Sequence, residues 1–142
     1  MSNIPKAIDR TFESIKVGEI YTQERTVRTE DIEAFAKLSG DYNPLHVDAT
    51  YAAATQFGKP VVHGMLLGAL VSELVGMHLP GMRCLLLKES LEFKLPVFAN
   101  DTVRVEGVIA HKSEAAKLLE IKITISRDTD IVVAGIVHTK VI

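Results

Sequence analysis

The chain has 142 residues, of which 47% are hydrophobic and 24% are charged, so it can bury the core of one domain. A formal net charge of −2 and a pI of about 6.2 make nucleic acids and anionic membrane surfaces poor candidates for partners. The one cysteine excludes an internal disulfide, which is typical of a reducing compartment.

Neither a secretion signal nor a membrane span is expected. The first residues, MSNIPKAIDRTFESIKVGE, contain no apolar signal region, and this absence predicts a cytoplasmic protein. The longest apolar stretch is residues 61–81, but Glu73 interrupts it, and its uncharged part is shorter than the roughly 18 residues of a membrane span. We therefore expect no contact with a membrane.

A strand and a helix are expected after an irregular start. Residues 18–29 are a plausible strand, and the apolar side chains of residues 29–40 have helical spacing. Thr29 is the expected N-cap of this helix. Gly40 stands where a left-handed residue would end it.

Two more helices are expected in the middle of the chain. After a loop at residues 41–47, residues 48–58 predict a short helix that Asp48 caps and Gly58 ends. A connector then leads to an unusually apolar helix at residues 64–78, which must be buried on most sides.

The second half of the chain has the alternation of strands, most clearly at residues 118–128. Alternation in consecutive segments predicts an antiparallel meander with one buried face. The expected strands are residues 85–95, 102–112, 118–128 and 131–142. An antiparallel sheet curved around one apolar helix is an α+β hot-dog fold, here a single domain over residues 1–142. Open sheet edges favour pairing with a second copy, so a homodimer or higher homo-oligomer is expected.

The segment SGDYNPLH, residues 39–46, concentrates polar chemistry between two helices. Pro44 stiffens the loop, so Asp41 and His46 can point into one small volume. A carboxylate and an imidazole that share a water molecule can act as an acid/base pair near neutral pH. Asn43 could orient the carboxylate or a ligand. Ordinary turn residues beside a packed histidine are the alternative.

A second feature lies at the start of the apolar helix, in VVHGML. The N–H groups at a helix N-terminus are unpaired and favour negative charge, and Gly64 would let a ligand approach closely. A carbonyl oxygen that gains charge could be stabilised there, as in an oxyanion hole. Alternatively, Gly64 only allows close packing of the helix and the sheet.

The segments SGDYNPLHVD, FGKPVVHGMLLGALVSELVG and LPG together resemble the MaoC-like, (R)-specific enoyl-CoA hydratase family, the hydratase-2 group of hot-dog proteins. The segment ESLEFKLPVFANDTV is similar to the strand and loop that follow in that family. The resemblance covers roughly residues 17–140. It implies reversible syn hydration of a trans-2-enoyl-CoA to an (R)-3-hydroxyacyl-CoA.

The resemblance also implies roles for five residues. Asp41 and His46 would be the catalytic pair that holds and activates water, and Asn43 would support them. The backbone N–H of Gly64 would bind the thioester oxygen. Ser72 matches a polar position near the active site of relatives. Coenzyme A would be part of the substrate, with no further cofactor and no metal. His63 is interpreted as a structural residue that orients the turn before the helix.

Several alternatives stay open. A 3-hydroxyacyl-ACP dehydratase of fatty-acid synthesis shares the motif and runs the reverse reaction on a carrier-protein thioester. A hot-dog thioesterase and a non-catalytic acyl-CoA-binding module are the others. The sequence leaves open the acyl chain length and the pathway, which could be polyhydroxyalkanoate supply, β-oxidation or fatty-acid synthesis. It also leaves open which of Asp41 and His46 is the base.

Overall fold

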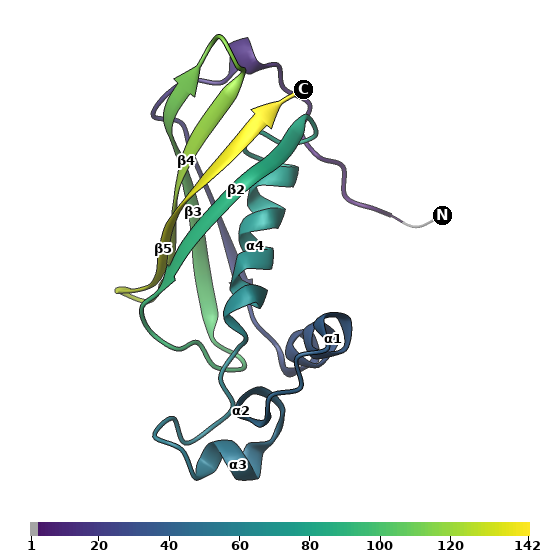
Figure 1. Cartoon of the computed structure of the whole chain (residues 1–142), viewed down its shortest axis with the longest axis vertical. Helices are drawn as coiled ribbons and strands as arrows, with labels where there is room; N and C mark the ends of the chain where they lie inside the picture. The colour runs from purple at the N-terminus through teal and green to yellow at the C-terminus, as the bar shows by residue number, and fades with distance from the viewer. Residues whose placement is uncertain (1–2) are drawn as a thin grey trace.

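A five-stranded antiparallel sheet wraps around one long helix in the computed structural model, which describes residues 3–142 (Figure 1). The helices are α1 (Thr29–Ser39), α2 (Pro44–Val47), α3 (Ala49–Ala53) and α4 (Gly64–Met77), and a 3₁₀ turn at Phe12–Ser14 precedes them. The strands are β1 (Ile20–Thr26), β2 (Cys84–Phe93), β3 (Thr102–Ser113), β4 (Leu118–Arg127) and β5 (Asp130–Val141).

The sheet has the order β1-β3-β4-β5-β2, and every neighbouring pair is antiparallel. The alternation in β4 has the expected consequence, because its apolar side chains are fully buried: Leu119, Ile121, Ile123 and Ile125. The predicted hot-dog arrangement is confirmed, and the strand expected at residues 85–95 corresponds to β2.

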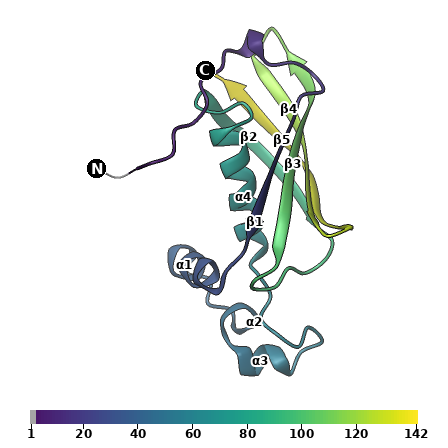
Figure 2. The ribbon, with the colours of Figure 1, turned by 180° about the vertical axis from the view of Figure 1, so that it is seen from behind.

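Helix α4 lies in the hollow of the sheet, as the view from behind shows clearly (Figure 2). Val71 and Leu74 on this helix are completely buried. The helix and the sheet approach closely at Gly107 of β3, where an added Cβ atom would lie 2.8 Å from a methyl carbon of Leu74. The uniformly apolar sequence of α4 is therefore explained by its position between the sheet and the segments around it.

The predicted N-cap of one helix and the predicted end of another were wrong. The N-cap of α1 is Arg28 instead of Thr29, because the Asp31 carboxylate accepts the Arg28 N–H at 2.9 Å. The helix expected at residues 48–58 begins at its Asp48 cap but ends at Ala53. The chain then continues as a turn, in which the N–H and the hydroxyl of Thr55 both donate to the carbonyl of Ala52, at 3.0 and 2.7 Å.

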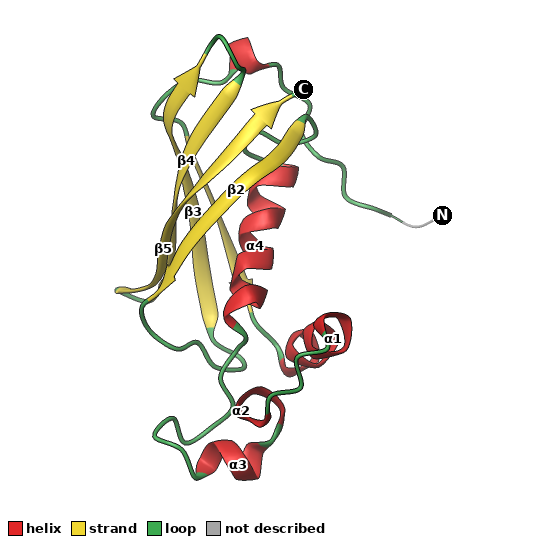
Figure 3. Ribbon diagram, viewed as in Figure 1, coloured by secondary structure: helices red, strands yellow, loops and turns green. Residues whose placement is uncertain are grey.

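The predicted loop at residues 41–47 also contains structure, since residues 44–47 form the helical turn α2. Helices α1, α2 and α3 gather at one end of the molecule, beside the first turn of α4 (Figure 3). The polar loop and the start of the apolar helix are thus brought to the same end of the fold. None of the helices within residues 3–142 is long and apolar enough to cross a membrane.

Glu89 is an acidic side chain on β2 that faces α4, with its carboxylate within 4 Å of the position of a Cβ added to Gly68. Burial raises the pKa of this carboxyl above its ordinary value. A folded state that holds the proton more tightly loses stability as the pH rises above the unfolded pKa. We therefore expect Glu89→Gln to raise the melting temperature at pH 7 by about 2 °C.

Thermal melts at two pH values test this expectation. The difference between wild type and Glu89→Gln should shrink as the pH falls below the ordinary glutamate pKa of about 4.3, because the carboxyl then becomes protonated in both states. Glu92→Gln is the matched control, because the Glu92 side chain lies on the same strand and is 79% exposed. Equal melting temperatures for wild type and Glu89→Gln at pH 7 would contradict the burial argument.

Candidate active site

Asp41 lies in the loop directly after α1, where Gly40 ends the helix with a φ of 78°. Its carboxylate oxygen Oδ1 accepts the backbone N–H of Asn43 at 3.1 Å. This bond orients the side chain, which is still 49% exposed. The carboxylate is therefore held in place and open to a small ligand at the same time.

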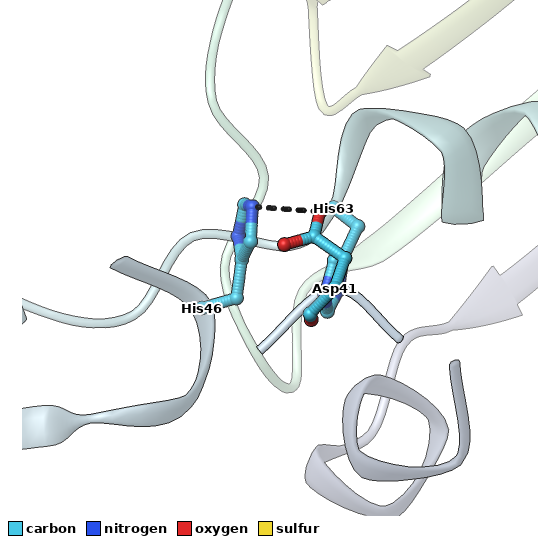
Figure 4. A group of neighbouring side chains, drawn as sticks. All are labelled: Asp41, His46 and His63. Carbon is cyan, nitrogen blue, oxygen red and sulfur yellow. Dashed lines mark hydrogen bonds and ion pairs between the residues drawn. The ribbon is translucent and has the colours of Figure 1, made fainter. Parts of the chain in front are cut away.

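His46 lies in the short helix α2, and its ring is fixed from behind. Its Nδ1 lies 2.6 Å from the carbonyl oxygen of Val61. A carbonyl can only accept, so Nδ1 carries the hydrogen and Nε2 of the neutral ring carries the lone pair. Nε2 lies 4.0 Å from Oδ2 of Asp41, as Figure 4 shows. One water molecule between these two atoms can reach both of them.

His63 precedes α4 and links the two sides of the site. Its side chain is 1% exposed, and its Nε2 lies 3.0 Å from the carbonyl oxygen of Asp41. Its ring also stacks on that of His46, with centroids 4.0 Å apart. Sequence reasoning interpreted His63 as a residue that orients a turn. The structure adds that it touches both members of the proposed catalytic pair.

Gly64 begins α4, so its backbone N–H has no carbonyl partner one turn earlier in the helix. Gly64 and His46 line the same open pocket, which has a volume of about 360 Å³. A Cβ atom on Gly64 would lie 3.2 Å from Cε1 of Phe93, another residue of the pocket wall. Glycine therefore leaves this side of the N–H accessible from the pocket.

Asn43 and Ser72, the two residues expected to support the catalytic pair, lie in different parts of the structure. The Asn43 side chain caps α2 by accepting the Leu45 N–H at 3.0 Å, while its own N–H holds Asp41. Ser72 is not brought to the pair within one chain. It is exposed on α4, eight residues or about 12 Å along the helix from Gly64. Met65 lies two turns before Ser72 and shares its exposed face of the helix.

Within residues 3–142, the fold creates one group of possible metal ligands that sequence spacing did not indicate. Donor atoms of Asp41, His46 and His63 lie within 4.8 Å of one another. Two of the four imidazole nitrogens already bind backbone carbonyls, those of Val61 and Asp41. The expectation that no metal takes part stays a prediction.

An apolar groove of about 270 Å³ lies between α1 and α4. Phe35, one of its wall residues, also packs against the ring of His63 with centroids 4.9 Å apart. The apolar lining residues are Val27, Ala34, Phe35, Leu38, Leu66, Ala69 and Leu70. Phe35 thus lines the groove and also contacts the polar site through His63.

The family model for the MaoC like domain matches residues 12–130 of this chain. The chain belongs to the MaoC-like family. The matched region includes every helix of the structure and all but the last part of the sheet. The polar loop, His63 and the start of α4 therefore all lie within the family's domain.

Two sequence relatives and one structure illustrate the similarity of this MaoC-like chain to known proteins. An (R)-specific enoyl-CoA hydratase of Aeromonas caviae is 47% identical over 94 residues, which are 66% of this chain and 70% of the relative. A protein of the same name from Rhodospirillum rubrum is 35% identical over 124 residues, 87% of this chain and 86% of the relative. The solved (R)-hydratase of A. caviae superposes with a TM-score of 0.88 at 37% identity, covering 92% of this chain and 99% of that one.

Proposed function

We propose that this MaoC-like protein is an (R)-specific enoyl-CoA hydratase. It would add water reversibly to a trans-2-enoyl-CoA and give an (R)-3-hydroxyacyl-CoA. The observation that carries the proposal is the 4.0 Å separation of Asp41 Oδ2 and His46 Nε2, beside a pocket that Gly64 also lines. Water held by this pair would face the double bond of a thioester bound at Gly64.

The hydrogen-bond pattern supports an assignment of the base. Because His46 donates its Nδ1 hydrogen to Val61, its Nε2 can take a proton from the bound water. The water oxygen then attacks C3 while Asp41 holds the second hydrogen. Nε2 returns its proton to C2, so one water is added in all. Both atoms reach the substrate from the side of the pair, which favours syn addition.

The negative charge that develops on the thioester oxygen needs a partner. The N–H of Gly64 would be this partner, because it lies at the N-terminus of a 14-residue helix, where the helix dipole is positive. Coenzyme A enters with the substrate, and the chain's own residues supply every proton transfer in this scheme. The proposed reaction therefore requires no further cofactor.

Crotonyl-CoA tests the proposal directly. We expect purified protein to lower the absorbance of the conjugated enoyl thioester to an equilibrium value without releasing free thiol, and chiral analysis should identify the (R)-3-hydroxy product. Release of free CoA would indicate a thioesterase instead. Reaction only with the acyl carrier protein thioester would indicate a dehydratase of fatty-acid synthesis. Inactivity toward both carriers and all chain lengths would overturn the enzymatic proposal.

We also propose that the protein is a homodimer joined along β2. Within residues 3–142, this strand pairs with β5 on one side and leaves its other edge open. Apolar side chains at and after this strand are about half exposed: Leu85, Leu86, Leu87, Phe93 and Leu95. An open apolar edge of this length favours pairing with another copy. A second copy would also cover the exposed face of α4.

Sedimentation analysis tests the dimer. We expect Leu86→Lys to shift the protein toward a monomer, because a lysine on an edge strand opposes pairing with another chain. Ile20→Lys is the matched control, since Ile20 is 62% exposed on β1 at the opposite edge of the sheet. A wild-type monomer, or a dimer that only Ile20→Lys disrupts, would rule out the β2 interface.

A further inference from the structure

We propose that Arg127 is a positioning residue that fixes the orientation of His46 through the loop at residues 94–101. This inference rests on the proposed function, because it concerns the ring that would activate water. Arg127 ends β4 and does not line the pocket that His46 and Gly64 share. Its influence on His46 would pass through three successive sets of hydrogen bonds.

The first step is the attachment of the loop to β4. Nη1 of Arg127 donates to the carbonyl oxygen of Pro96 and to Oδ2 of Asp101, each at 2.8 Å. Both side chains of this ion pair are 23% exposed, so the pair is partly shielded from water. The same Asp101 oxygen accepts the N–H of Phe98 at 2.9 Å. One guanidinium thus holds both ends of the turn and, through Asp101, its middle.

The second step joins the loop to the connector before α4. The carbonyl of Val97 accepts the N–H of Val62 at 2.7 Å, and Phe98 forms an antiparallel bridge with Val61. Val61 also donates its N–H to the carbonyl of Leu45 at 3.1 Å. The peptide of Val61 is therefore held between the loop on one side and α2 on the other.

The third step reaches the ring itself. The Val61 carbonyl is the partner of His46 Nδ1 at 2.6 Å, and this contact assigns the lone pair to Nε2. A small displacement of the loop would move this carbonyl and weaken its hold on the Nδ1 hydrogen. The ring would then populate its other tautomer, which presents a donor instead of an acceptor to the water.

These contacts favour a role of Arg127 in the active site over a purely structural role, in which it would only hold the end of β4. A purely structural role would need only the ion pair between Arg127 and Asp101. Here the guanidinium also binds a backbone carbonyl in the pocket wall, since Pro96 and Val97 both line the pocket of His46. Arginine suits this task because the two hydrogens of Nη1 lie in the plane of the guanidinium and reach two acceptors in a fixed geometry.

Arg127→Met and Arg127→Lys test the inference in the full chain. The matched control is Arg104→Met, which removes an exposed arginine of β3 whose contact to Glu106 is 3.8 Å long. Long-range ¹H–¹⁵N spectra of the imidazoles would report the tautomer of His46. Hydration of crotonyl-CoA would report kcat and KM, and thermal melts would report stability.

We expect Arg127→Met to populate the Nε2–H tautomer of His46 and to lower kcat about 10-fold with KM changed less than 3-fold. Arg127→Lys should recover part of both, and Arg104→Met should match wild type. If Arg127→Met lowered the melting temperature but left the tautomer and kcat unchanged, the proposal would be overturned and Arg127 would have a structural role only. If wild type does not hydrate the substrate, the proposed function fails, while the tautomer still decides whether Arg127 positions His46.

Discussion

Asp41→Asn is expected to lower kcat for hydration of crotonyl-CoA about 1,000-fold, within the range usual for loss of a general acid–base group. The amide keeps the size of the side chain, and its oxygen can still accept the Asn43 N–H that now binds Oδ1. It lacks the charge that, in the proposed mechanism, would orient the water and stabilise a proton on His46, 4.0 Å away. The loss should therefore fall on kcat and leave the fold unchanged.

Asp128→Asn provides the matched control. It makes the same chemical change at an exposed residue of the turn between β4 and β5, where φ is 52° and asparagine is well tolerated. This variant should keep wild-type kcat and KM. If Asp41→Asn hydrated crotonyl-CoA within 3-fold of wild type, Asp41 would have no part in the chemistry.

Most of the fold could be predicted because its elements have clear periodicity. The buried residues of β4 alternate with half-exposed ones, and α4 is apolar on nearly every side. Such patterns report a buried face directly. The predictions failed at helix ends, where local hydrogen bonds determine which residue caps or ends the helix. The bond from the Arg28 N–H to the Asp31 carboxylate makes Arg28 the N-cap of α1, and the turn in which Thr55 binds the carbonyl of Ala52 follows α3 early.

The site could be predicted only in part, for a related reason. Asp41 and His46 are five residues apart on a stiff loop, so the sequence itself brings them together. Asn43 in the same loop orients the Asp41 side chain, but the other partners come from the connector before α4, because Val61 holds His46 and His63 reaches the carbonyl of Asp41. These contacts depend on how the connector folds back on the loop. The signal that pointed toward His63 was its position directly before Gly64, the predicted start of the apolar helix.

Gly64→Ala is the second large expected effect, a loss of about 100-fold in kcat/KM, similar to the loss of one oxyanion donor. Alanine suits a helix better than glycine, so the substitution should not unfold α4. The new methyl would stand 3.2 Å from Cε1 of Phe93, whose half-exposed ring can shift. It would also occupy the approach to the N–H from the pocket, and the thioester oxygen could no longer reach its donor.

Gly76→Ala on the same helix separates this effect from a general response of α4. In the part of the chain that the structure describes, nothing lies within 4 Å of a Cβ atom added there. This control should keep wild-type kcat/KM and melt slightly higher, because alanine reduces the entropy of the unfolded chain. Wild-type activity in Gly64→Ala would mean that the developing charge is stabilised elsewhere. Equal losses in both variants would show that α4 tolerates no added methyl, whatever its distance from the N–H.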